Sequence, residues 1–297
     1  MGLSKLMMRL TVLSLIALIA LAQSPTANIG GTVTDSQGAV VLGAKVTSIN
    51  LRTQIRNESQ TDMSGLFALR QLPIGEYVIE VEMDGFRKYV RQGIVLTTGD
   101  NIELNVKLEL GAVAESVTIS ASASRLETRT SDYTQLVEAK SVENLPLGDR
   151  RALNLIQMTG AAVFVGYDSG GKPNFSLAGG RTQSQNFWID GGTGQNMRLG
   201  VGQVDTDPPV ETLQEVKVLA NSVSAEFGGS AGGNIIATTK SGTNEFHGSL
   251  FEYLRNEKLD APGFFAPIQD GKKTRAPLRY NVFGGTIGGP VIKNKTF

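Results

Sequence analysis

The residues that could carry out acid–base or metal chemistry in this chain are few and scattered. His247 is the single histidine and the sequence has no cysteine, which excludes a multi-histidine metal site, thiol catalysis and a disulfide framework. Glu211 and Glu215 lie four residues apart and could share one face of a helix, as paired catalytic carboxylates would. Isolated carboxylates at this spacing are usually solvated, so no glycosidase site is predicted.

Three further patterns also fail as reactive or binding motifs. Asp205 and Asp207 lie two residues apart, but Pro208-Pro209 follows and the other ligands of a calcium loop are missing. The segment 191–194 is glycine-rich, yet it lacks the lysine of a phosphate loop and the spacing of a dinucleotide site. No serine lies in a G-x-S-x-G setting. We therefore predict a protein that is not an enzyme and has no cofactor and no metal site.

Composition and charge favour a chain rich in β-structure and turns. Lysine plus arginine and aspartate plus glutamate both number 28, so there is no overall field to recruit nucleic acid. The 35 glycines exceed the share of an average globular protein. The length is sufficient for two domains of ordinary size. We expect no nucleic-acid partner.

The N-terminus has the pattern of a secretory signal peptide. Lys5 and Arg9 precede an apolar run from Leu10 to Ala22, which ends in an A-x-A sequence. The alternative, a membrane anchor, needs about 20 apolar residues. We predict a signal peptide over 1–22, with cleavage after Ala22 and export from the cytoplasm.

Residues 27–110 predict a small β-sandwich of the transthyretin or immunoglobulin type. Short alternating strands such as 44–50, 77–82 and 102–110 are separated by turn sequences. The segment resembles the carboxypeptidase regulatory-like domain. That resemblance is carried by turn and core residues: Gly31, Val33, Asp35, Gly38, Gly43, Ala44, Val46, Thr61, Asp62, Gly65, Phe67, Leu72, Pro73, Gly75 and Tyr77. Nothing in it resembles a metallopeptidase site, so we interpret it as scaffold.

Residues 111–124 are predicted to be a linker that contains one strand-prone segment. Small residues flank Glu115, Ser116, Val117, Thr118 and Ile119, and the Val-Thr-Ile core strongly favours extended backbone. Such a segment could add as a strand to the sheet edge of a partner. The alternative is that it forms the last strand of the sandwich.

Residues 125–243 combine one amphipathic stretch with short strands and turns. Arg150–Met158 has Leu153, Ile156 and Gln157 at helical spacing, which predicts a helix. Strand and turn patterns follow at 175–181, 186–191 and 210–218.

Residues 225–256 are glycine-rich and then alternate. Four glycines between 228 and 233 suggest backbone packed closely against another segment. Beyond them, 245–255 and 279–288 alternate as strands with two different faces, and turns are predicted at 260–263 and 269–272.

These motifs in order resemble TonB-dependent outer-membrane receptors, especially the large Oar-like receptors with an N-terminal regulatory-like domain. The resemblance implies a mainly β chain with some α-structure. It would comprise the sandwich, an α+β plug over 125–243, and the first strands of an incomplete transmembrane β-barrel over 244–297, where the chain stops within an element. It also implies an outer-membrane location, with the sandwich and plug on the periplasmic and lumen side.

The resemblance assigns roles to particular residues. The segment 115–119 would bind the periplasmic protein TonB, which would pull on the plug and gate uptake of an extracellular ligand, a siderophore, oligosaccharide or peptide. The plug motif residues would be Gly179, Gly180, Arg181, Asn186, Asp190, Gly191 and Glu211. Arginine follows the glycines here, whereas many relatives have it before them, so a latch to the barrel wall through Arg181 is not assured. Asp190, Glu211 and Glu215 would face a watered lumen, or else lie at a solvated surface or cap turns.

A second class of function is compatible with the same patterns. A secreted β-rich adhesion or carbohydrate-binding module would also be exported, rich in turns and devoid of catalytic motifs. Barrel sequence downstream of Phe297 in the parent gene would distinguish the receptor from the module.

Overall fold

In the computed structural model the chain forms two compact units, Met1–Ser241 and Gly242–Phe297. The predicted signal peptide and Glu115 lie outside the described residues. No helix in the described part of the chain is both long and apolar enough to cross a bilayer. The described residues are 26–111, 116–120, 134–138, 150–168, 172–182, 184–194, 206–220, 230 and 232–297.

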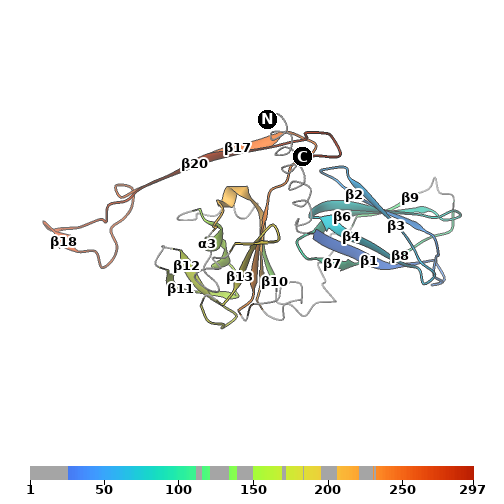
Figure 1. Ribbon diagram of the computed structural model, residues 1–297, viewed down its shortest axis with the longest axis horizontal. Coiled ribbons are helices and arrows are strands. Elements are labelled where there is room, and N and C mark those ends of the chain that lie inside the picture. The colour runs from blue at the N-terminus through green and yellow to red at the C-terminus, as the bar shows by residue number, and fades with distance from the viewer. Residues whose placement is uncertain are drawn as a thin grey trace, which may run out of the picture. The chain divides into compact units, whose positions relative to one another are not determined.

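The first part of unit 1 is a sandwich of two sheets (Figure 1). In one sheet β1 lies between antiparallel β4 and the two short parallel strands β7 and β8. In the other sheet the order is β3-β2-β5-β6-β9, antiparallel except for the parallel pair β6–β9. The strands are β1 Thr26–Thr34, β2 Lys45–Asn50, β3 Arg56–Gln60, β4 Leu66–Pro73, β5 Gly75–Glu82, β6 Lys88–Leu96, β7 Asn101–Glu103, β8 Val106–Lys107 and β9 Ser116–Ser120.

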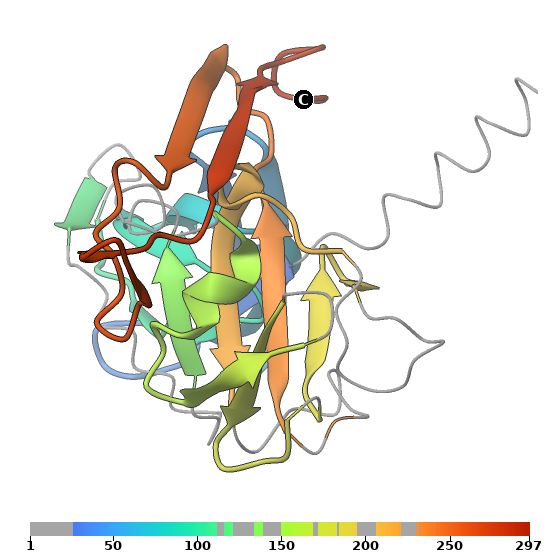
Figure 2. The ribbon, with the colours of Figure 1, turned by 90° about the vertical axis from the view of Figure 1, so that its left-hand side faces the viewer.

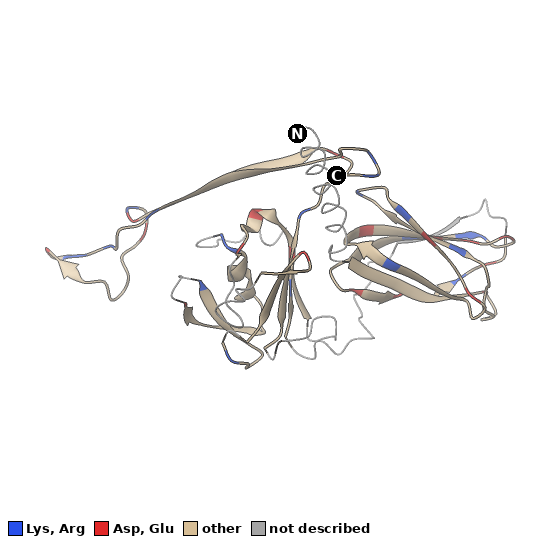
Figure 3. Cartoon of the chain, in the orientation of Figure 1, with Lys and Arg blue, Asp and Glu red and all other residues tan. Residues whose placement is uncertain are grey.

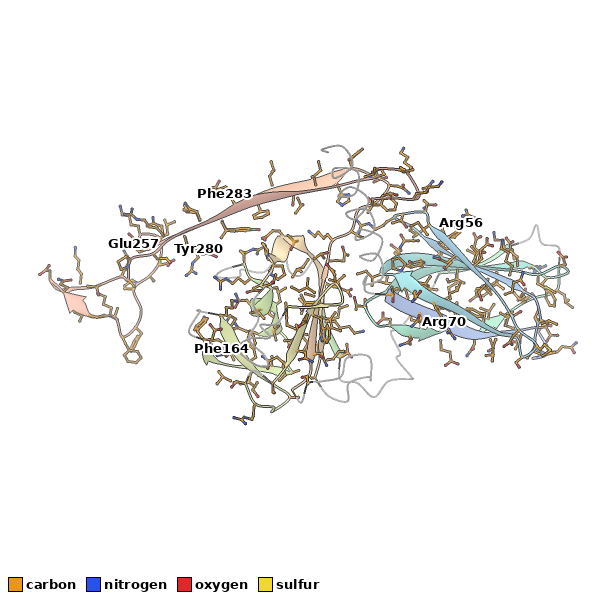
Figure 4. All side chains as sticks on the ribbon, in the orientation of Figure 1. Arg56, Arg70, Phe164, Glu257, Tyr280 and Phe283 are labelled. Atoms are coloured by element: carbon orange, nitrogen blue, oxygen red, sulfur yellow. The ribbon has the colours of Figure 1, made fainter. Side chains whose placement is uncertain are left out.

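Alternating side chains from both sheets fill the space between them. Every second residue of β1 is buried, which is the period-2 pattern of a strand with one inward face. Ile29, Leu72, Tyr77 and Ile79 are fully buried members of this core. The hydroxyl of Tyr77 donates a hydrogen bond to the carbonyl of Pro73 at 2.7 Å, which satisfies its polar end. The outward faces carry polar side chains, as Arg56 on β3 and Arg70 on β4 illustrate (Figure 4).

The second part of unit 1 is a five-stranded sheet in the order β10-β15-β16-β13-β14. A short helix, α3, and a 3-10 turn, η2, pack with it, and β11 and β12 form a separate hairpin. Figure 2 shows α3, in yellow-green, against one face of the sheet. The elements are β10 Thr134–Glu138, α3 Ala152–Ile156, β11 Ala162–Tyr167, β12 Pro173–Leu177, β13 Asn186–Ile189, β14 Gly192–Thr193, η2 Val210–Thr212, β15 Leu213–Leu219 and β16 Asn234–Thr239.

The core of this part joins the helix to the central strands. Leu155 and Ile156 pack with Phe187, Val216 and residues of β16. The helix is shorter than the predicted 150–158, because a turn follows its last residue, Ile156. Gln157 lies in this turn and is exposed.

Unit 2 contains a long antiparallel hairpin and a small one at its far end. In β17 (His247–Asn256) every residue pairs with one of β20 (Arg279–Gly288), and β18 (Ile268–Gln269) pairs with β19 (Lys272–Lys273). Charged residues are sparse along most of this ribbon (Figure 3). The predicted strand 279–288 is confirmed, as is the turn within 269–272, which Asp270 and Gly271 form with positive φ angles. The predicted mainly β fold class is confirmed for the residues that the structure describes.

Candidate functional site

The predicted partner-binding segment forms strand β9 along most of its length. Ser116–Ser120 pairs in parallel with Lys88–Gln92 of β6, at the edge of a sandwich sheet. This is the arrangement that the sequence left open as an alternative. The pairing occupies one backbone edge of the segment. Binding of a partner by strand addition stays a prediction.

The glycine motif at 179–181 forms a tight turn after β12. Gly179 has a φ of +78°, and a Cβ on Gly180 would come within 3.2 Å of the Cα of Gly232. Two glycines from distant parts of the sequence therefore let their backbones approach closely. Arg181 is exposed, and its proposed latch stays a prediction.

The segment 186–191 forms β13 and the turn into β14. Asp190 and Gly191 both have positive φ, 48° and 82°, as a two-residue type I′ turn requires. The Asp190 carboxylate accepts hydrogen bonds from the backbone N–H and the hydroxyl of Thr239, at 2.9 and 2.7 Å. It therefore ties the turn to the end of β16. Asn186 is buried at the start of β13.

Glu211 is buried rather than solvent-facing, which corrects the expectation from sequence. Arg150 Nε donates a hydrogen bond to Glu211 Oε1 at 2.8 Å, and Arg150 Nη2 forms an ion pair with the same oxygen at 2.7 Å. Both side chains are almost completely buried. Asp207 lies nearby in the chain and accepts a hydrogen bond from the backbone N–H of Leu153 at 3.2 Å, within the first turn of α3. Both carboxylates therefore hold the segment 207–212 to the start of the helix.

Glu215 is also buried, and it lies on β15 rather than on a helix shared with Glu211. Its Oε1 atom accepts a hydrogen bond from the backbone N–H of Thr98, a residue of the sandwich, at 2.8 Å. Burial raises the pKa of Glu215 above its usual value, and the hydrogen bonds from Thr98 and the charge of Lys217 offset only part of that effect. The solvated role expected for Glu215 is therefore wrong.

Sequence reasoning missed Arg150, Thr98, Asp100 and Lys217. Glu215 and Lys217 lie two residues apart, so both belong to one face of the strand predicted within 210–218. This spacing indicates that the face is polar. No local pattern indicates which distant residues cover that face.

Among the residues that the structure describes, the other candidates form no reactive arrangement. His247 is exposed on β17, and its Nδ1 lies 3.0 Å from the carbonyl oxygen of Glu245. Within the described ranges, no three histidine, cysteine, aspartate or glutamate residues group as metal ligands would.

Two family models match this sequence. Residues 28–109 match the carboxypeptidase regulatory-like domain, and residues 238–297 match the outer membrane beta barrel domain. The sequence is also 28% identical, over 289 residues, to the TonB-dependent transporter Oar of Myxococcus xanthus. That alignment covers 93% of this chain but 26% of the relative, so the chain spans about a quarter of its length. These matches support an outer-membrane location.

Several solved structures resemble parts of the chain. The siderophore receptor PirA from Acinetobacter baumannii is 22% identical, with 54% of this chain and 22% of that one covered and a TM-score of 0.40. A mutant of the ferric enterobactin receptor PfeA from Pseudomonas aeruginosa is 19% identical, with 53% and 22% covered and a TM-score of 0.39. A hydroxyquinol 1,2-dioxygenase from Pseudomonas putida is 12% identical, with 30% and 57% covered and a TM-score of 0.26.

Proposed function

We propose that this chain, which is similar over most of its length to a TonB-dependent transporter, is part of an outer-membrane receptor of that class. The observation that carries the proposal is the order of matched regions along one chain. A regulatory-like sandwich at 28–109 precedes an outer membrane beta barrel match at 238–297, and the same alignment to the transporter runs through both. The intervening sheet would be the plug.

The hairpin of unit 2 supports a barrel role because it has no core of its own. Leu250, Phe283 and Ile287 lie on one face with exposed fractions of 93%, 78% and 89%. The opposite face carries the aromatic rings of Phe251, Tyr253 and Tyr280 (Figure 4, where Tyr280 and Phe283 are labelled). A two-stranded hairpin is at best marginally stable in water. Its strands have the length, about 9–11 residues, that spans a bilayer.

Energy coupling would act through residues 115–119. TonB would bind this segment by strand addition and pull on it, using the proton-motive force. The plug would then shift to admit a ligand bound outside the cell, such as a siderophore, an oligosaccharide or a peptide. Since Ser116–Ser120 pairs with β6, the segment must leave that strand if TonB is to take the same backbone edge.

Pulldown by the C-terminal domain of TonB from the same organism tests the proposal. Strand addition needs backbone N–H groups, so Val117→Pro should lower retention by about tenfold or more. Val117→Ala is the matched control, because this substitution shortens the side chain and keeps the backbone N–H. The Val117→Ala chain should be retained nearly as well as wild type.

The full-length parent protein should be found in the outer-membrane fraction. Recovery of the protein outside the envelope, or equal retention of the proline and wild-type chains, would contradict the proposal. A secreted adhesion or carbohydrate-binding module would give the first of these results together with no TonB binding at all.

A further inference from the structure

We propose that the loop Thr97–Asp100 of the sandwich and the polar face of β15 and β16 form a releasable docking site that holds the sandwich on the five-stranded sheet. We call its residues the docking cluster: Thr98, Asp100, Glu215, Lys217 and Thr238. The docking cluster joins two parts of one unit, whether or not the chain has the proposed transport role.

The loop offers both backbone and side-chain groups to the sheet. Besides the Thr98 N–H that reaches Glu215, the carbonyl of Thr98 accepts a hydrogen bond from the Lys217 ammonium at 2.7 Å. The hydroxyls of Thr98 and Thr238 lie 2.8 Å apart. One short loop therefore contacts two adjacent strands.

An ion pair completes the contact. Lys217 Nζ lies 3.0 Å from Asp100 Oδ1, and the exposed fractions of the two side chains are 6% and 8%. The other oxygen of Asp100 accepts hydrogen bonds from the backbone N–H and the hydroxyl of Thr97, both at 2.7 Å. The loop thus holds its carboxylate in place for the lysine.

Burial makes this contact specific. Charges taken out of water must be paired and hydrogen-bonded, and removing one partner leaves the other charge uncompensated. Glu215, Lys217 and Asp100 are all buried where the sandwich loop meets the sheet. A strand face that alternates carboxylate and ammonium is therefore stable here only with a partner that supplies complementary groups.

The contact is also built to open without unfolding either part. In the described residues, the sandwich core and the core beneath α3 are separate clusters with no shared member. The docking cluster itself is polar. Polar contacts between domains are typical of interfaces that permit relative motion. Undocking would leave both of these clusters complete. Ile236, which lies opposite Lys217 on the same face and is 2% exposed, belongs to neither cluster and is the apolar part of the contact.

Distance measurement in the full chain tests this proposal. Because the sequence has no cysteine, spin labels at Arg70→Cys on β4 and Gln157→Cys after α3 report a single pair of sites. Both positions are exposed. Electron–electron double resonance on the wild-type background should give one narrow distance distribution.

Lys217→Met should broaden that distribution, with the ratio of docked to undocked molecules falling by about a hundredfold or more. Lys45→Met is the matched control: Lys45 forms a 2.7 Å pair with Glu58, but the two are 45% and 54% exposed, so the distribution should stay narrow. Asp100→Ala approaches the same pair from the sandwich side, in case Lys217→Met unfolds the sheet. The fluorescence of Trp188, the single tryptophan, monitors the sheet in each variant.

A narrow, unchanged distribution in either folded variant would overturn the docking site, as would a broad distribution in the wild-type background. Broadening in both variants and not in Lys45→Met would establish it. None of these outcomes involves TonB, so the result is independent of the pulldown above.

Discussion

The sandwich of unit 1 and the hairpin of unit 2 use the same alternating strand pattern with opposite results. In the sandwich the apolar members of β1, β4 and β5 turn inward and are almost completely buried between two sheets. In the hairpin, the apolar side chains Leu250 on β17 and Ile287 on β20 lie on one face but are about nine-tenths exposed. The first region therefore folds around its own core, and the second does not.

Alternation in a strand specifies two faces and not what surrounds them. A strand face is buried only where another layer covers it. The sandwich supplies its second layer within about eighty residues. The hairpin presents Leu250, Phe283 and Ile287 on one face with no covering layer, which suits contact with hydrocarbon rather than packing in water.

The largest effect should come from removing one charge of a buried pair. Glu211→Gln leaves the Arg150 guanidinium buried beside a neutral side chain, and should lower the free energy of unfolding of unit 1 by about 3–5 kcal/mol. Glu252→Gln makes the same chemical change on the exposed hairpin, and should change it by less than about 0.5 kcal/mol. Urea denaturation followed by Trp188 fluorescence measures both. Similar losses of stability in the two variants would show that the buried pair contributes no more to stability than an exposed carboxylate does.

A matched pair of leucines gives the next effect. Leu72→Ala opens a cavity in the sandwich core and should cost about 2–5 kcal/mol. Leu250→Ala removes the same atoms from a side chain that is 93% exposed, so the stability of the chain in water should barely change. Circular dichroism during urea denaturation reports both variants. A large loss for Leu250→Ala would mean that the hairpin face is covered in solution.

The two regions also contain matched turns. Gly191 and Gly271 each follow an aspartate with positive φ, and their own φ angles are +82° and +74°. Gly191→Val should lower the stability of the five-stranded sheet by about 1–2 kcal/mol, because valine is strained in the left-handed region. Gly271→Val carries the same strain in an exposed small hairpin, and the Trp188 transition should not move. Equal thermal stability of Gly191→Val and wild type would contradict the turn assignment.

The smallest effect should be a pH dependence of the free energy of unfolding of unit 1, which arises from buried Glu215. Its pKa is raised in the folded protein, chiefly by burial, so the folded state binds this proton more readily than the unfolded state. The stabilisation that protonated Glu215 contributes is fully present below about pH 4.5, and it is lost as the pH rises through the raised pKa.

The difference in unfolding free energy between wild type and Glu215→Gln isolates this contribution. The stability of wild type relative to Glu215→Gln should fall as the pH rises from 4.5 toward neutrality. The pKa of Glu82 is lowered, mainly by its hydrogen bond to Lys88, so its own contribution changes below pH 4.5 and does not overlap. A difference that is flat from pH 4.5 to 8 would show that Glu215 is solvated.

Much of this architecture follows from the sequence alone. Alternating strands, Gly-containing turns and the pattern at 27–110 predict the sandwich, because side-chain period and turn chemistry are local properties. The turn at Asp190-Gly191 and the strand Arg279–Gly288 follow from the same kind of signal. The motifs also carry the resemblance to receptors, since they are short and contiguous.

Tertiary structure alone decided which polar residues are buried and what they contact. Glu211 is expected to be solvated when judged from its neighbours in sequence, yet its partner Arg150 is 61 residues away. Glu215 and Lys217 contact Thr98 across 117 and 119 residues. The same is true of Ser116–Ser120, whose neighbour β6 decides whether it is a free tether or the edge of a sheet. Burial and pairing arise from chain segments that meet only on folding, and no local pattern contains that information.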